Sequence, residues 1–282
     1  YSSDEITTEE SAELIHFIRE NLKREHIRFY NGISYRHLMV WDKAPEKLTL
    51  VPPHDISGRP VKDYLPDNEV ILGIMKESRE LLMNHPVNRA RREKGLNTAD
   101  SLWIWGEGKK PMLTPFEKEY GLRGAVVSAV DLVKGIGRLA GLKVIDVPGA
   151  TGNINTNFEG KAKASVDALC EGYDFVYLHM EAPDECGHRG ETENKVKSIE
   201  IIDRIVVKYI KDKLTEKGID FKMMIMPDHP TPLITKTHAR DPVPCLIYDS
   251  RIEKKGVKTF AEKSVGNKVF EPGYRLMEYF IK

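Results

Sequence analysis

The sequence contains little cysteine, and the cysteines it has are scattered. Three occur in 282 residues, at Cys170, Cys186 and Cys245, and no C-x-x-C pair is present. An odd number of widely separated cysteines argues against a disulfide framework. We therefore expect reduced thiols and a cytoplasmic setting.

The chain also lacks an excess of either charge. Lysine and arginine together number 43, as do aspartate and glutamate. The sequence therefore has no basic footprint of the kind that binds nucleic acid or an anionic membrane. A site for an anion must use a few well-placed arginine or lysine side chains. The composition leaves open whether the chain forms a homo-oligomer.

Long apolar runs are missing as well. The longest are strand-sized, so we expect no membrane span, and the N-terminal residues do not have the shape of a signal peptide. Hydrophobic residues make up 40% of the chain and charged residues 30%, as in ordinary soluble globular proteins. The first residue is Tyr1 rather than methionine, and we expect the native start to lie upstream.

The C-terminal two thirds of the chain predict an α/β fold. From Gly124 onward, apolar strand-like runs alternate with segments of helical periodicity. Such alternation indicates a parallel or mixed sheet covered by helices. The expected strands are 124–129, 143–147, 175–180, 221–226 and 245–248, and the expected helices are 131–139, 159–169, 194–214 and 273–281.

The N-terminal third predicts a smaller α/β domain. Thr7 followed by Glu10 forms a capping box, which marks the start of a helix. Strands are expected at 27–30 and 35–41, joined by a turn at Asn31-Gly32, with a second helix at 70–84. We place the domains at 1–102 and 103–282, because the character of the sequence changes near Ser101.

Two of the predicted strands are followed by segments rich in aspartate and histidine. Asp184 and His188 follow the first strand, Asp228 and His229 follow the second, and His238 comes nine residues later. Either pair alone could be a solvated turn, and each histidine could be an ordinary loop residue. Because ligands bind at the carboxyl ends of strands in α/β proteins, the five together favour a divalent metal site.

Counting ligands suggests two metal ions. Asp184, His188 and His238 fill one site and leave a position open for substrate or water, which is typical of catalytic metals. Asp228 and His229 serve a second ion that needs further ligands. Two such ions suit in-line displacement at phosphorus.

These segments resemble the cofactor-independent phosphoglycerate mutases of the alkaline phosphatase superfamily, and most closely their archaeal-type group. The resemblance covers nearly the whole chain. Its motifs are E-A-P-D-E-C-G-H at 181–188, P-D-H-P-T-P at 227–232, T-H-A-R-D-P-V-P at 237–244, P-P-H-D-I-S-G at 52–58 and H-P-V-N-R-A-R at 85–91.

The resemblance implies an architecture and a set of sites. It implies an alkaline-phosphatase-like sheet flanked by helices in 103–282, with its N-terminal part missing, and an inserted substrate-binding domain in 1–102. Two divalent ions, Mn²⁺, Mg²⁺, Co²⁺ or Zn²⁺, and no organic cofactor are expected. By the resemblance, Asp184, His188, His238, Asp228 and His229 match metal ligands. Asp55 and Arg91 match the substrate site, and the neighbouring Arg89 and Arg92 are further candidates for binding substrate.

The resemblance also implies a reaction. Family members are expected to interconvert 2-phosphoglycerate and 3-phosphoglycerate through a phosphoserine, in glycolysis and gluconeogenesis. The serine and a further metal-binding aspartate belong to an N-terminal segment of the family that has no counterpart here. We therefore expect this chain alone to be inactive and the full-length parent to be active.

Several alternatives stay open. The chain could belong to a metal-dependent phosphatase or a phosphopentomutase of the same superfamily, or to a non-catalytic metal- or metabolite-binding regulator. The segment from Arg89 to Arg92 could be a solvated helix end, and Asp55 could stabilise a turn before Ile56. Lys161 could meet an anion at a helix start or be a plain surface lysine. A serine nucleophile upstream of Tyr1 would discriminate between an enzyme and a regulator.

Overall fold

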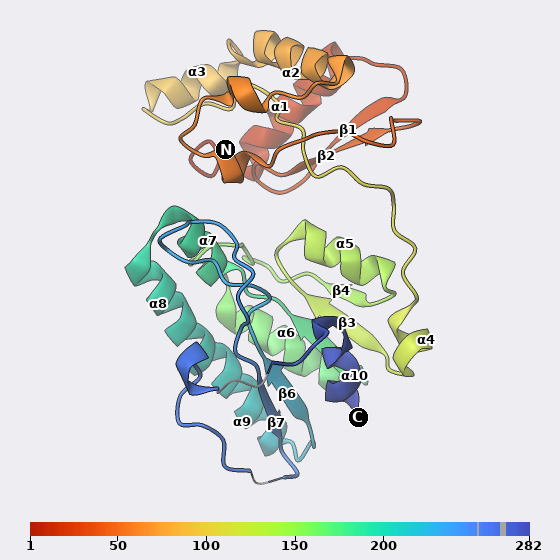
Figure 1. Cartoon of the computed structure of the whole chain (residues 1–282), viewed down its shortest axis with the longest axis vertical. Coiled ribbons are helices and arrows are strands. Elements are labelled where there is room, and N and C mark those ends of the chain that lie inside the picture. Colours follow the sequence, from red (N-terminus) through yellow and green to blue (C-terminus); the bar gives the residue numbers. More distant parts are fainter. Residues whose placement is uncertain (253, 266–268) are drawn as a thin grey trace. The chain divides into compact units, whose positions relative to one another are not determined.

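The computed structural model describes residues 1–252, 254–265 and 269–282. The chain forms two compact units, Tyr1–Lys110 (unit 1) and Pro111–Lys282 (unit 2) (Figure 1). Residues 103–110, which we expected to begin the second domain, fall in unit 1, where the Trp103 indole donates to the Val51 carbonyl over 2.8 Å. The functional assignments of the two domains stay predictions.

Unit 1 consists of helices packed on a two-stranded antiparallel sheet. Its apolar core joins Ile18 of α1, Phe29 of β1 and Ile74 of α2. The elements are α1 Thr8–Asn21, β1 Ile27–Asn31, β2 His37–Trp41, the 3₁₀ helices Pro53–Ile56 (η1) and Val61–Tyr64 (η2), α2 Glu69–Leu82 and α3 Pro86–Glu93.

The capping box predicted for α1 is confirmed. Thr7 Oγ1 accepts from the Glu10 amide at 3.2 Å, and Glu10 Oε2 accepts from the Thr7 amide at 3.4 Å. Both bonds satisfy amides that a helix start leaves without an intrahelical partner. The helix therefore begins where the sequence predicts.

The predicted two-residue turn at Asn31-Gly32 is wrong. Asn31 still belongs to β1, where it pairs with His37, so the connection is five residues long. Ser34, with φ of 54°, holds this connection against the start of α1. Its hydroxyl donates to the Ile6 carbonyl at 2.7 Å and its amide donates to Thr8 Oγ1 at 3.1 Å. These tertiary contacts outweigh the local turn preference of Asn-Gly.

Unit 2 contains a three-stranded parallel sheet of order β4-β3-β5 and a separate antiparallel pair, β6-β7. The alternation of strands and helices predicted from Gly124 onward is confirmed. The elements are α4 Phe116–Tyr120, β3 Gly124–Val127, α5 Asp131–Leu139, β4 Lys143–Ile145, α6 Phe158–Cys170, β5 Phe175–Leu178, α7 Ala182–Arg189, α8 Thr192–Ile201, the π-helix Ile202–Val207 (η3), α9 Lys208–Glu216, β6 Lys222–Ile225, β7 Leu246–Asp249, the 3₁₀ helices Glu262–Ser264 (η4) and Gly273–Arg275 (η5), and α10 Leu276–Ile281.

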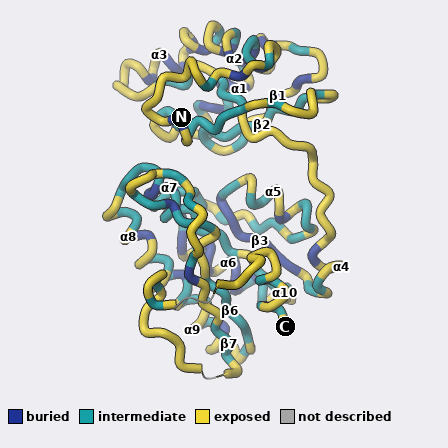
Figure 2. The backbone as a smooth tube through the Cα atoms, viewed as in Figure 1, coloured by how far each residue is buried: buried dark blue, intermediate teal, exposed yellow. Residues whose placement is uncertain are grey.

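The central strand β3 is buried along its whole length (Figure 2). Helix α5 lies close to it because Gly137 has no side chain: a Cβ there would come within 2.6 Å of Val126 Cγ1. On α6, Phe158 and Ala162 pack with Ala182, the first residue of α7, and with Val206 of η3. This packing fixes the start of α7, which carries part of the site described below.

The segment that joins the two units should be the first place that trypsin cuts. Residues 103–115 form no helix or strand, and the Lys109 side chain is 83% exposed. Cleavage should occur after Lys109, since Pro111 blocks the bond after Lys110. Mass spectrometry should find fragments 1–109 and 110–282. Lys109→Gln should abolish this cut, and a wild-type digest that never yields fragments 1–109 and 110–282 would contradict the prediction.

Unit 1 should lose stability as pH falls from 6.5 toward 4. Burial lowers the pKa of His37 from 6.5 to about 4, and its Nδ1 accepts from the Gly32 amide at 3.3 Å. Within that window the unfolded chain takes up a proton that the folded chain does not, so the free energy of unfolding rises with pH. The slope from this one group is at most about 1.4 kcal/mol per pH unit.

Tryptophan fluorescence in urea would measure this slope, because Trp41, Trp103 and Trp105 all lie in unit 1. His37→Gln should make the dependence on pH shallower between pH 4 and 6.5. His16→Gln, at an exposed position of α1, is the matched control and should keep the wild-type slope. Equal slopes in all three proteins would show that His37 does not titrate as proposed.

Candidate metal centre

Asp184 and His188 lie on helix α7, so the alternative of a solvated turn is wrong for this pair. Pro183 stands in the first turn of this helix, and Gly190 ends it with φ of 72°. Both are ordinary boundary signals that the sequence already contained. Because residues four apart share one helix face, the two side chains point the same way.

The polar atoms of Asp184, His188 and His238 converge. His188 Nε2 lies 3.3 Å from Asp184 Oδ2, His238 Nε2 lies 3.5 Å from Asp184 Oδ1, and the two Nε2 atoms are 3.1 Å apart. One ligand atom from each residue lies within 4.8 Å of the others. One carboxylate oxygen and two imidazole nitrogens facing one point suit a divalent transition-metal ion.

The second ring nitrogen of His188 supports this arrangement. Its Nδ1 lies 2.9 Å from the Lys236 carbonyl oxygen. Because a carbonyl only accepts, Nδ1 carries a proton, which leaves Nε2, the nitrogen that faces Asp184 and His238, as the one available to a metal ion. Metal-binding histidines commonly donate their other N–H in this way. The residues therefore fit a metal ion.

The second aspartate–histidine pair lies at the same place. The segment 227–240 follows β6 and returns to α7 (Figure 1). The rings of His229 and His238 lie 3.7 Å apart between centroids, and His229 Nε2 is 3.4 Å from Asp228 Oδ2. The structure thus places His229 beside His238, while among the described residues only Asp184, His188 and His238 bring their ligand atoms to one point.

The negative charge of Asp184 is stabilised by contacts with neighbouring polar side chains. Burial alone would raise the pKa of Asp184, but hydrogen bonds with His188 and Thr231 and the charge of His238 lower it to about 2. The bond to Asp184 raises the pKa of His188. The aspartate is therefore ionised at neutral pH, as a metal ligand must be.

Three neighbouring polar residues were missed by sequence reasoning. Thr231 bonds to Asp184, Lys195 donates to the Thr231 carbonyl at 2.8 Å, and the His179 Nδ1 lies 3.2 Å from Ser128 Oγ. Burial lowers the pKa of His179. Thr231 could have been suspected from its place in P-D-H-P-T-P, whereas Lys195 has no local signal because it reaches the site from another helix.

Lys161 lies in the first turn of α6 and is buried. Its side chain is 1% exposed, so the alternative of a plain surface lysine is wrong. The Nζ atom reaches the Thr151 carbonyl at 3.4 Å. Burial lowers its pKa to about 8, against the opposing charge of Glu181. The ammonium therefore belongs to the interior of unit 2.

The predicted substrate residues lie in unit 1 and have different surroundings. Arg91 is 2% exposed: its Nε donates to the Asn97 carbonyl at 2.8 Å, its Nη1 donates to Glu10 Oε2 at 2.5 Å and its Nη2 donates to the Ser3 carbonyl. This guanidinium links α3 to the N-terminal residues and does not face solvent. The alternative of a solvated helix end is wrong for it.

The other three substrate candidates are accessible. Arg89 and Arg92 are exposed on α3, and the Arg92 Nη2 donates to the Met83 carbonyl at 2.8 Å. The Asp55 side chain, in η1, is 46% exposed and lies 3.9 Å from His54 Nε2. Their role in binding substrate stays a prediction.

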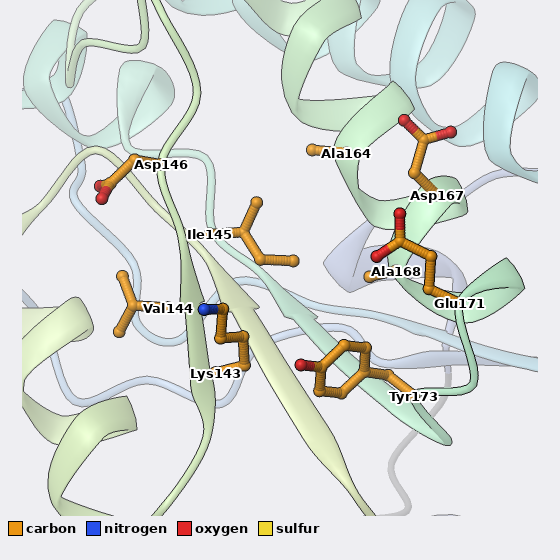
Figure 3. A pocket seen from close by; sticks show the side chains of 9 residues that line it. All are labelled: Lys143, Val144, Ile145, Asp146, Ala164, Asp167, Ala168, Glu171 and Tyr173. Carbon is orange, nitrogen blue, oxygen red and sulfur yellow. The ribbon is translucent and has the colours of Figure 1, made fainter.

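An open hollow of about 430 Å³ lies between β4 and α6 (Figure 3). Its walls carry the carboxylates of Asp146, Asp167 and Glu171. Lys134 pairs with Asp146 at 2.6 Å and Lys163 pairs with Asp167 at 2.5 Å. None of the five metal-ligand candidates lines the hollow, so it is separate from the metal centre.

Comparison with known proteins assigns the class. A model of the metalloenzyme superfamily matches residues 18–270. The chain is thus a member of this superfamily of metal-dependent enzymes. No helix in the described part of the chain has both the length and the apolar character needed to cross a membrane.

The relatives narrow the assignment further. A probable 2,3-bisphosphoglycerate-independent phosphoglycerate mutase from Geobacter sulfurreducens is 46% identical over 287 residues, covering all of this chain and 71% of its own length. The mutase of that name from Methanosarcina acetivorans is 46% identical over 272 residues, covering 95% of this chain and 68% of its own. The chain belongs to the 2,3-bisphosphoglycerate-independent phosphoglycerate mutase family.

Solved structures agree with the fold. A protein from Pyrococcus horikoshii superposes with a TM-score of 0.68 at 31% identity, covering 93% of this chain and 65% of its own. A cofactor-independent phosphoglycerate mutase from Thermoplasma acidophilum superposes with a TM-score of 0.52 at 24% identity, over 96% of this chain and 68% of its own. The α/β, alkaline-phosphatase-like fold class expected from the sequence is confirmed.

Removing one metal-ligand candidate should weaken divalent-cation binding. We expect His188→Ala to lower the affinity for Mn²⁺ by more than about 100-fold, since outer partners alone contribute about 10- to 100-fold. A histidine must be unprotonated to bind a metal ion. The Mn²⁺ affinity of the wild-type protein should therefore decrease as the pH is lowered through the pKa of His188, which lies above its ordinary value. Isothermal titration calorimetry measures both effects.

The matched control for this experiment is His16→Ala, which removes an exposed imidazole from α1 in unit 1. It should leave Mn²⁺ affinity at the wild-type value. If His188→Ala and His16→Ala bind Mn²⁺ equally well, His188 is not a ligand.

Proposed function

We propose that this chain forms part of an enzyme that interconverts 2-phosphoglycerate and 3-phosphoglycerate with two divalent metal ions. The observation that carries the proposal is the meeting of two aspartate–histidine segments, one on α7 and one after β6, within a family of phosphoglycerate mutases. Residues far apart in the chain would not converge with this chemistry by local preference alone.

The donor set indicates which ions are suitable. Asp184, His188 and His238 would hold one ion, and Asp228 and His229 would supply ligands to the second. Two imidazoles in the first set favour Mn²⁺, Co²⁺ or Zn²⁺ over Mg²⁺, which prefers oxygen ligands. When bound, such ions stabilise negative charge on phosphoryl oxygens and activate a hydroxyl nucleophile. No organic cofactor is needed for this chemistry.

Residues of the chain would supply charge, orient a metal ligand and bind the substrate. Asp184 supplies a negative charge, and the bond from His188 Nδ1 to the Lys236 carbonyl would turn Nε2 toward the ion. In unit 1, exposed Arg89 and Arg92 suit the carboxylate and phosphate of a phosphoglycerate, because a guanidinium binds such groups with two parallel hydrogen bonds.

We assign the other two unit 1 candidates differently. Asp55, partly exposed in η1, suits a substrate hydroxyl. Arg91, with its guanidinium engaged by Glu10, Ser3 and Asn97, would act by holding α3 in position and not by direct contact.

The phosphoryl acceptor is proposed to lie outside these 282 residues. Ser128 follows β3, but it is 2% exposed, and its hydroxyl accepts from the Val130 amide at 3.0 Å and contacts His179. A hydroxyl held in this way is not presented to a substrate. The chain spans 71% of the length of the Geobacter relative and 68% of that of the Methanosarcina one.

The proposed setting is the cytoplasm. Cys170, Cys186 and Cys245 are all free, and the substrate is a small phosphorylated metabolite. Neither nucleic acid nor a membrane is a proposed partner, in keeping with the balanced charge of the sequence. We make no proposal on whether the protein forms a homo-oligomer.

A ³¹P NMR assay with 3-phosphoglycerate and Mn²⁺ tests the function. The 282-residue chain alone should give no conversion, while a protein that joins it to the serine-bearing segment should produce 2-phosphoglycerate. His188→Ala in that longer protein should abolish turnover, because one ion loses a ligand. Conversion by the chain alone would contradict the placement of the serine, and release of inorganic phosphate alone would indicate a phosphatase.

A further inference from the structure

Thr231 lies between the two sets of metal-ligand candidates. The residue is 5% exposed, and its hydroxyl oxygen bonds to Asp184 Oδ1 and lies 3.3 Å from His229 Nδ1. One hydroxyl thus contacts a residue of the first set and a residue of the second.

The directions of these two bonds follow from the groups involved. An ionised carboxylate only accepts hydrogen bonds, so the Thr231 hydroxyl donates its single proton to Asp184. The same oxygen must then accept from His229, which places a proton on Nδ1 of that ring. His229 is left with its Nε2 lone pair for a metal ion, the same arrangement that the Lys236 carbonyl gives His188.

The backbone of Thr231 is fixed from the opposite side. Lys195, on α8, donates from Nζ to the Thr231 carbonyl at 2.8 Å. Gly187, on α7 between Asp184 and His188, allows this approach: a Cβ there would lie 2.6 Å from the Thr231 oxygen and 2.9 Å from Lys195 Nζ. The segment after β6 is therefore held against α7 at the level of the two ligands.

We propose that Thr231 is a positioning residue that couples the two metal sites, and that Lys195 anchors it. By donating to Asp184 and accepting from His229, the hydroxyl sets the orientation of one ligand of each ion. This inference rests on the metal centre proposed above. It goes beyond the ligand set, because neither Thr231 nor Lys195 binds a metal itself.

The side chain's shape and its hydroxyl can be tested separately. Thr231→Val keeps the branched shape and removes the hydroxyl, whereas Thr231→Ser keeps the hydroxyl. Thr231→Val should weaken the binding of each Mn²⁺ ion that the wild-type protein takes up by about 10- to 100-fold, the usual effect of losing a partner of a metal ligand. Thr231→Ser should bind Mn²⁺ with nearly wild-type affinity, because it keeps the hydroxyl. Thr215→Val, at an exposed position of α9, is the matched control.

Calorimetry with Mn²⁺ gives the affinities, and the visible absorption of bound Co²⁺ reports ligand geometry. Thr231→Val should shift the Co²⁺ spectrum, and Thr231→Ser should restore it. A purely structural role would change thermal stability and leave the spectrum of the folded, loaded protein unaltered. Wild-type affinities and spectrum in folded Thr231→Val would overturn the proposal.

If Thr231→Val does not fold, Gly187→Ala and Lys195→Met carry the test, because they displace Thr231 without touching its hydroxyl. Both should weaken Mn²⁺ binding, and Gly135→Ala, at an open position of α5, should not. Wild-type binding by both would overturn the proposal. The experiment separates the two proposals. If the wild-type chain binds no Mn²⁺, the proposed metal centre is wrong. If the wild-type chain binds Mn²⁺ strongly and these variants have no effect, only the proposed role of Thr231 is wrong.

Discussion

The interaction on which the rest of unit 2 depends is that of the Asp184 carboxylate with its neighbours. This charge is three quarters covered, with 25% of its side chain exposed, and a buried carboxylate without partners is strongly unfavourable. His188, His238 and Thr231 contact its two oxygens and keep it ionised. These partners come from α7 and from the segment after β6, so satisfying one carboxylate requires both parts of the chain to be in place.

Packed elements of the fold hold α7 and the segment after β6 in place. Helix α7 begins at Ala182, which packs against α6 and η3, so Asp184 stands two residues from a fixed point. The segment 227–240 has no helix or strand of its own, and it depends on contacts with α7 and α8 for its position. A site built on a helix and a tethered segment in this way can be preorganised for metal binding.

Sequence reasoning selected the ligand candidates but not their local structure. The five ligand candidates were recognisable because aspartate and histidine followed two apolar runs, and the capping box of α1 was recognisable because it involves residues three apart. The turn after β1 was misassigned because Ser34 is held by Ile6 and Thr8. The interior position of Arg91 was missed because its partner Glu10 lies 81 residues away along the chain.

By itself, the sequence determined which segments become strands and helices in unit 2, which side chains are candidates for metal binding and to which family the chain is similar. These features depend on local periodicity and residue type. Only the tertiary structure decided that His238 lies against Asp184, that Thr231 bonds to Asp184 and that Lys195 holds Thr231. Such contacts join residues 36 to 54 positions apart, and no local preference encodes a distance between segments that meet only when the core has packed.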